Sequence, residues 1–166
     1  KLFHDKVDDY IGSTTVAGVI QPQNSGGLAL RGGDLQVTWQ PTQAFRLTAQ
    51  YARVFISTSP GIDLVDSQVK RSVPRESSSL LARYDLGHGW TASAGVYHSG
   101  RMYWLNGGES TPAFTRVDAR LARRWVWLGR EVEAAVVGQN LGDDYSEFRQ
   151  ENIFSRRVYG SLGFSW

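Results

Sequence analysis

The residues of this chain that could do chemistry are charged side chains at every second position of two neighbouring segments. In residues 114–125 and 130–139, charged residues alternate with apolar ones. The charged positions on one face are Arg116, Asp118, Arg120, Arg124, Glu131 and Glu133. Side chains two residues apart in a β-strand lie on the same face. We expect these six residues either to hold a structure that occupies the space they face, or to be solvated side chains without a binding role.

The pairing of these charges depends on the turn between the two segments. If the turn around residues 127–129 pairs Trp125 with Arg130, Arg124 faces Glu131 and Arg120 lies diagonal to Glu133. Opposite charges across a strand pair stabilise it modestly, and an exposed ion pair contributes about 0–1 kcal/mol. We therefore expect the charged cluster to matter more for contact with a partner than for stability.

Other catalytic and metal-binding chemistry finds no support in the sequence. The three histidines, His4, His88 and His98, fall in unrelated segments without metal-ligand spacing. The acidic residues between positions 140 and 154 lack the order and glycine placement of a calcium loop. Cysteine is absent, and no local motif arranges a serine, a histidine and an aspartate as a triad. The sequence therefore predicts a protein that is not an enzyme and that needs no cofactor or metal ion.

The charge balance argues against nucleic acid as a partner. The 166 residues include 18 Lys+Arg and 16 Asp+Glu, a formal net charge of +2, and the basic residues are spread along the chain. No stretch reaches the roughly 18 apolar residues of a membrane-spanning helix.

The segments that must position the charged residues have the two-residue period of β-strands. Long connections are predicted over residues 12–27, 57–73, 100–113 and 140–154, and short turns at residues 41–42, 87–89 and 127–129. Long and short connections alternate, which predicts about eight antiparallel strands in an up-and-down order. Because one face of each strand is apolar and the other polar, the predicted fold is an all-β, antiparallel, transmembrane β-barrel, or the last part of a larger one.

The last stretch, Arg156 to Trp166, indicates which kind of membrane. Val158, Leu162 and Phe164 alternate with polar residues, and the chain stops on an aromatic residue. About ten residues are enough for one tilted strand to cross a bilayer. The stretch looks like the closing strand of a bacterial outer-membrane protein, which the barrel-assembly machinery recognises.

The tryptophans support a membrane and orient the chain in it. Those beside a short turn or at the terminus are Trp39, Trp90, Trp125, Trp127 and Trp166. Tryptophan at one level of every hairpin is typical of an interfacial girdle. In outer-membrane barrels the short turns are periplasmic and the long loops extracellular. We therefore expect the chain in the outer membrane of a Gram-negative bacterium, in contact with lipid and lipopolysaccharide, with its carboxy-terminus in the periplasm.

One predicted outer loop combines aromatic and polar side chains. Arg101, Tyr103, Trp104 and Asn106 follow a predicted strand end, and their mixture suits stacking on, and hydrogen bonding to, a polar ligand. The alternative is an outer girdle or a loop that faces lipopolysaccharide.

Several short motifs, in order along the chain, resemble those of one family. Asn140–Tyr145 resembles the Asn-Leu-x-Asp-x-Tyr element near the carboxy-terminus of TonB-dependent outer-membrane receptors. Arg31–Pro41 resembles their Arg-Gly-x-Glu-x-x-x-x-Trp-x-Pro strand, with Asp34 in place of Glu. Thr115–Asp118 is similar to the start of a late strand, and Pro74-Arg75 to the proline that opens another.

This resemblance implies the role of the chain. It would be the carboxy-terminal segment, residues 1–166, of a receptor barrel of roughly 22 strands, without the plug domain. The parent would import a scarce ligand, an iron–siderophore complex above all, or cobalamin or a sugar, using energy delivered by TonB. The charged cluster would then face the lumen and contact the plug.

Two alternatives stay open at this point. One is a self-sufficient eight-stranded outer-membrane barrel that serves as an adhesin or a structural protein, and the other is a soluble, lipocalin-like binding barrel. Lys1–Ile11 alternates poorly and has Asp5 and Asp9 on its apolar face. We expect it to form the outer half of a strand whose membrane half lies upstream, so that the 166 residues do not close a barrel alone.

Overall fold

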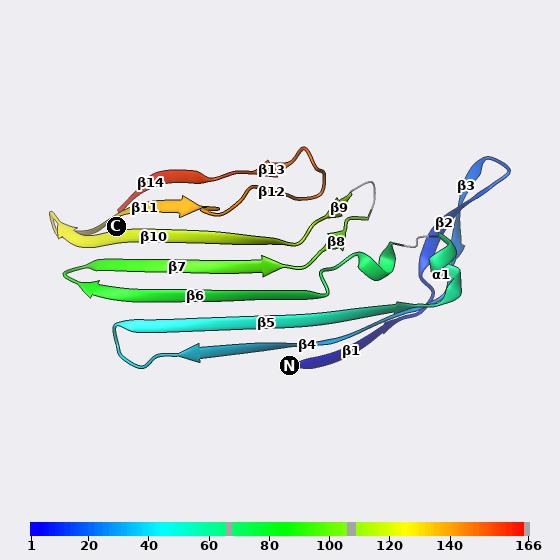
Figure 1. The fold of residues 1–166 in the computed structure, drawn as a ribbon, viewed down its shortest axis with the longest axis horizontal. Helices are drawn as coiled ribbons and strands as arrows, with labels where there is room; N and C mark the ends of the chain where they lie inside the picture. The colour runs from blue at the N-terminus through cyan, green and yellow to red at the C-terminus, as the bar shows by residue number, and fades with distance from the viewer. Residues whose placement is uncertain (66–67, 106–108, 165–166) are drawn as a thin grey trace.

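The computed structural model describes residues 1–65, 68–105 and 109–164 and contains one large antiparallel sheet. Its eight strands, in order across the sheet, are β1 (Leu2–Val7), β4 (Leu28–Trp39), β5 (Phe45–Thr58), β6 (Glu76–Gly87), β7 (Trp90–Ser99), β10 (Phe114–Trp127), β11 (Arg130–Gln139) and β14 (Arg157–Phe164). Figure 1 shows them side by side in one layer, with short turns at the left and long connections at the right. The predicted up-and-down order is confirmed.

The two faces of the sheet separate as the alternation predicts. On β10, Val117 and Leu121 share a face, and in the neighbouring β7 they lie opposite Val96 and Ala92. The same apolar row continues across β11, where Leu121 lies opposite Val136. We call this the outer face; the opposite face, which carries the charged cluster, is the inner face. Val136 is 58% exposed, so the outer face is apolar without being covered by the described residues.

Two of the short connections are two-residue turns with positive φ. His88 and Gly89 have φ of 52° and 79°, and Leu128 and Gly129 have φ of 51° and 74°. Positive φ at both central residues is the mark of the type I′ turn, whose twist matches that of the flanking strands. Glycine takes this conformation without strain, which explains its place at the second position of both turns.

The long connections contain short elements of their own. They hold the hairpin of β2 (Ile11–Val16) and β3 (Val19–Asn24), helix α1 (Pro60–Val65), the 3-10 turn η1 (Val69–Arg71), β8 (Met102–Tyr103) with β9 (Ser110–Thr111), and β12 (Tyr145–Ser146) with β13 (Ile153–Phe154). The prediction of a loop over residues 12–27 was therefore wrong. Ala17 and Gly18, with φ of 50° and 81°, form a turn that lets the β-branched residues on either side pair.

The first strand covers only half of its neighbour. β1 pairs with residues 28–33 of β4, and residues 34–39 of β4 pair with β5 alone. Within the predicted half-strand Lys1–Ile11, a strand forms over Leu2–Val7 beside the long-connection end of β4, and Ile11 belongs to β2. In the part of the chain that is described, β1 and β14 are the two edges and do not pair with each other, so the sheet is open and does not form a closed barrel.

The final strand is described as far as Phe164, and residues 165–166 of the predicted Arg156–Trp166 strand lie outside the described residues. Among the described residues, no helix is long and apolar enough to cross a membrane.

Candidate functional site

The inner face carries a row of polar side chains that crosses five strands at one level. Each residue of the row lies directly opposite the next one on the neighbouring strand. In the order β4, β5, β6, β7 and β10 they are Gln36, Gln50, Ser79, Tyr97 and Arg116. The Gln50 amide donates to Gln36 Oε1 at 2.9 Å, and the Ser79 hydroxyl donates to Gln50 Oε1 at 3.2 Å. The guanidinium of Arg116 lies 4.7 Å from the ring centre of Tyr97. The row therefore presents uncharged donors and acceptors over β4 to β7 and one cation at β10.

The charged cluster lies nearer the short turns, and its pairing differs from the predicted one. The turn is one of two residues, so Trp127 pairs with Arg130, and Arg124 faces Glu133 instead of Glu131. The carboxylate of Glu133 accepts from Arg120 at 2.5 Å and from Arg124 at 3.0 Å.

The other two members of the predicted cluster take separate positions. Arg116 forms an ion pair with Asp118 at 3.1 Å. Glu131 lies opposite Val126 near the turn and is exposed. The structure thus brings five of the six predicted residues into ion pairs and leaves Glu131 at the end of the sheet.

Two inner-face arginines outside the predicted charged cluster lie directly opposite each other. Arg46 of β5 is the partner of Arg83 of β6, and both are exposed. Like charges at such positions destabilise a strand pair. The Arg46 guanidinium donates to the side chain of Gln40 at 3.0 Å, a neutral partner. This pair adds positive charge to the inner face, and its register could be found only after the turns were known.

Asn140 joins the last long connection to the sheet. It is 3% exposed and has φ of 48°, which asparagine tolerates better than most residues. Its backbone N–H donates to Asp118 Oδ1 at 3.0 Å, and its side-chain amide donates to the carbonyl of Phe154 at 2.7 Å. The motif that begins at Asn140 therefore has a structural role here, because it fixes both ends of the connection.

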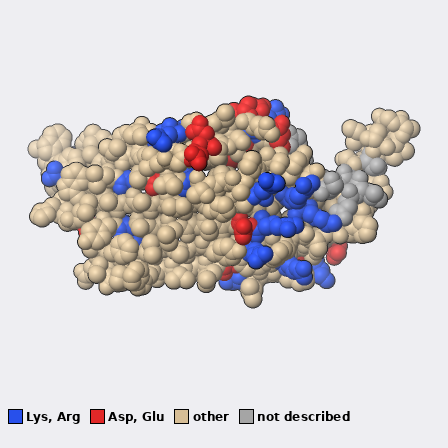
Figure 2. All heavy atoms as spheres, in the orientation of Figure 1, with Lys and Arg blue, Asp and Glu red and all other residues tan. Residues whose placement is uncertain are grey.

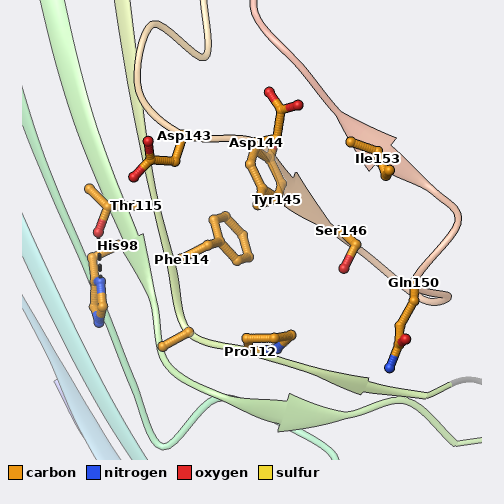
Figure 3. Close-up of a pocket in the computed structure, with 11 residues that line it drawn as sticks. His98, Pro112, Phe114, Thr115, Asp143, Asp144, Tyr145, Ser146, Gln150 and Ile153 are labelled. Atoms are coloured by element: carbon orange, nitrogen blue, oxygen red, sulfur yellow. Dashed lines mark hydrogen bonds between the residues drawn. The ribbon is translucent and has the colours of Figure 1, made fainter.

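A stack of three aromatic rings continues from this point. Tyr145 lies between Phe114 at 4.1 Å and Phe154 at 5.2 Å, with nearly parallel rings. Beside the stack is a hollow of about 550 Å³ whose lining also includes His98 and Thr115. Figure 3 shows the hydrogen bond of 3.0 Å between His98 Nδ1 and the Thr115 hydroxyl. Within residues 1–65, 68–105 and 109–164, no three His, Cys, Asp or Glu side chains are grouped so as to hold a metal ion.

The predicted ligand loop is divided by the structure. Arg101 and Tyr103 line a hollow of about 590 Å³ with Arg71 and Arg75. Trp104 does not contribute to that lining. Its indole N–H donates to the Thr111 hydroxyl at 3.0 Å, and its ring lies edge-on to Phe148 at 5.8 Å. Asn106 lies outside the described residues.

The tryptophans beside the short turns lie on the outer face. Trp39 is 57% exposed and Trp127 58% exposed, and Trp125 lies opposite Val132 of the apolar row. Trp90 is covered by the guanidinium of Arg123 at 5.5 Å. The four described tryptophans of the predicted girdle therefore gather at the same end of the sheet, and Trp166 lies outside the described residues.

Comparison with known proteins gives consistent matches. Residues 1–141 match the family model described as "TonB dependent receptor-like, beta-barrel". The metal-pseudopaline receptor CntO of Pseudomonas aeruginosa is 29% identical over 143 residues, which are 82% of this chain and 18% of that protein.

Solved structures show the same fold at lower identity. FpvA of P. aeruginosa, in complex with a pyoverdine and iron, superposes with a TM-score of 0.71 at 13% identity, covering 99% of this chain and 24% of that one. The ferric-catecholate import receptor Fiu of E. coli superposes with a TM-score of 0.66 at 17% identity, covering 97% and 24%. The chain thus spans about a quarter, or less, of the length of these relatives.

Proposed function

Because this chain belongs to the family of TonB-dependent receptor β-barrels, we propose that it forms the carboxy-terminal wall of an outer-membrane receptor that imports a scarce ligand. An iron–siderophore complex is the first choice of ligand, and cobalamin or a sugar is the alternative. The names of CntO, a metal-pseudopaline receptor, and Fiu, a ferric-catecholate import receptor, support this choice. The relatives are transport receptors, which agrees with a protein that is not an enzyme. Membership of this family also disfavours a soluble lipocalin-like barrel.

The observation that carries the proposal is the difference between the two faces of one sheet. The outer face has an apolar row with exposed side chains such as Val136, and tryptophans at one end. The inner face has the hydrogen-bonded Gln50 row and the ion pairs of Glu133. A wall with lipid on one side and a wet or protein-filled lumen on the other needs this division.

The inner face supports a contact with the plug domain of the parent receptor. Arg116, Arg120 and Arg124 lie on it with their carboxylate partners, and Arg46 and Arg83 add positive charge without an acidic partner among the described residues. An ion pair at such an interface gives specificity and register more than affinity. In this proposal TonB acts on the plug, and the wall supplies the fixed surface against which the plug is held.

The test is metal accumulation by cells whose only receptor for the chelate is the full protein that carries this chain. We expect iron supplied as a ferric siderophore to accumulate in these cells and not in cells without the receptor. Deletion of TonB should abolish the accumulation while the receptor remains in the outer membrane. Accumulation of cobalamin or a sugar in place of iron would show that the ligand class is wrong. Failure to accumulate any of the three would contradict the transport role.

A further inference from the structure

A cluster of arginines at the loop end of the sheet has no part in the inner-face site. We propose that Arg71, Arg75 and Arg101 bind the phosphate groups of the outer-leaflet glycolipid, lipopolysaccharide, at the rim of the membrane. The inference rests on the proposed function, because it requires the sheet to span the outer membrane with its long connections outside. It selects the lipid-facing alternative for Arg101 and Tyr103 over contact with the imported ligand.

The backbone holds the three arginines together although they come from three segments. Arg71 ends η1, and its N–H donates to the carbonyl of Gln68 at 2.8 Å. The carbonyl of Arg75 accepts from the N–H of Val54 in β5 at 3.0 Å. Arg101 follows Gly100, whose N–H donates to the carbonyl of Glu76 at 2.9 Å. The three side chains line one hollow of about 590 Å³. Because their backbones are already fixed, little ordering is needed when an anion binds.

The described carboxylates do not neutralise the charge around this hollow. All three arginine side chains are exposed, and none forms an ion pair with a described carboxylate. The one carboxylate in the lining, Glu76, lies directly opposite a fourth arginine, Arg53, in the β5–β6 pair. Arginine is well suited to phosphate because its planar guanidinium can donate two parallel hydrogen bonds. The local excess of positive charge therefore favours the binding of an anionic partner.

The lining of the hollow includes a residue of the outer, lipid-side face of the sheet. Glu76 is two residues before Ser78 and four before Leu80, which lies opposite Val96 in the apolar outer row, so Glu76 belongs to the outer face. Figure 2 shows one face with few charged side chains over most of the strands and with Lys and Arg gathered at the right. In Figure 1 this place corresponds to η1 and β8. Since the inner face carries the charged cluster, the less charged face in Figure 2 is the outer one.

The hollow also has an apolar side. Val73, Met102 and Tyr103 line it together with the arginines, and all three are half-buried. A site that joins several cations to apolar side chains, directly above an apolar belt, matches a phosphorylated lipid better than a free anion. The imported chelate would have to approach from the lumen, on the other side of the sheet.

The experiment compares purified full receptor with its Arg71→Gln/Arg75→Gln/Arg101→Gln variant. The probe is diphosphorylated lipid A in detergent micelles, and the measurement is its dissociation constant. Because each arginine near a lipid surface contributes to binding, we expect the triple variant to bind at least about tenfold more weakly, with a smaller dependence on salt. An Arg71→Lys/Arg75→Lys/Arg101→Lys variant keeps the charge and should recover part of the loss.

Three further measurements distinguish binding of the lipid phosphates at this site from binding of free phosphate and from a general effect of charge. Lipid A without its phosphates should bind wild type and variant equally, and millimolar inorganic phosphate should not displace the lipid. The matched control Arg149→Gln/Arg156→Gln/Arg157→Gln removes the same charge from the last connection and the first residue of β14, and it should leave the affinity unchanged. Equal binding of lipid A by wild type and triple variant would overturn the inference, as would equally tight binding of inorganic phosphate. If such a receptor still imported its chelate, the proposed function would stand and only this inference would fail.

Discussion

The backbone N–H of Asn140 donates to the carboxylate of Asp118 at 3.0 Å, across the ends of two neighbouring strands. Asn140 is 3% exposed, so its N–H has no access to bulk water. The same carboxyl group pairs with Arg116 at 3.1 Å. One aspartate therefore links the last connection, strand β10 and the cation of the inner polar row.

Removing this carboxylate should loosen the last connection. Asp118→Ala leaves a buried N–H without an acceptor, which costs about 1–3 kcal/mol. We expect a lower thermal midpoint of the receptor in detergent and faster protease cleavage between residues 147 and 152. Asp118→Asn keeps an acceptor oxygen and should lose less. Asp143→Ala removes an exposed carboxylate from the same connection and is the matched control; equal effects at both positions would contradict this account.

Glu133→Gln should separate stability from transport. Its two ion pairs are partly exposed, so their loss should change the free energy of unfolding by less than about 1 kcal/mol. If Arg120 and Arg124 also hold the plug, the variant should import the chelate more slowly at normal receptor abundance. Glu151→Gln, which breaks an exposed loop pair with Arg149, serves as the control. Unchanged uptake in both variants would remove the cluster from the plug contact.

An added charge should destabilise the receptor strongly on the outer face and only mildly on the inner face. Val136→Arg places a guanidinium near the middle of the proposed lipid-facing surface, which should destabilise the receptor by roughly 2–4 kcal/mol. Gln50→Arg, in the inner polar row, should be mild by comparison. Unfolding by denaturant in lipid vesicles measures both. If the order of the two effects came out reversed, the faces would have been assigned the wrong way round.

The orientation of the chain can be tested by labelling. Single cysteines at Gln21, in hairpin β2–β3, and at Gln150 should react with an impermeant thiol reagent on intact cells, because both residues are exposed in long connections. Cysteines at Gln43 and His88, within short connections, should react only after the outer membrane is opened. Labelling of Gln43→Cys or His88→Cys on intact cells would place the tryptophan-rich end outside.

The sequence was sufficient for the strands and their faces because a two-residue period is a local property. It also placed the tryptophans at the short turns. It failed on the pairing of Arg124, because a longer turn moves the register by two residues and exchanges Glu133 for Glu131. Residues 12–27 were mistaken for a loop because their content of Gly, Ser and Gln is typical of loops. The β-branched residues between them nevertheless pair as a hairpin.

Contacts between connections could not be predicted from the sequence. The indole N–H of Trp104 donates to the Thr111 hydroxyl, and its ring packs on Phe148, which comes from a connection 44 residues further along the chain. Similarly, Arg71 and Arg101 share a hollow although they are 30 positions apart. Such proximity follows from how the connections fold over the strand ends, and no local pattern encodes it.

The order of strands in the large sheet has a consequence for how such a receptor can diversify. Each strand pairs only with its neighbours in chain order, and each pair has its own turn to set the register. A change of length in one outer connection, such as hairpin β2–β3, leaves the hydrogen bonding of the other pairs untouched. The connections can therefore change in length and sequence one at a time, while the strands of the large sheet keep their pairing.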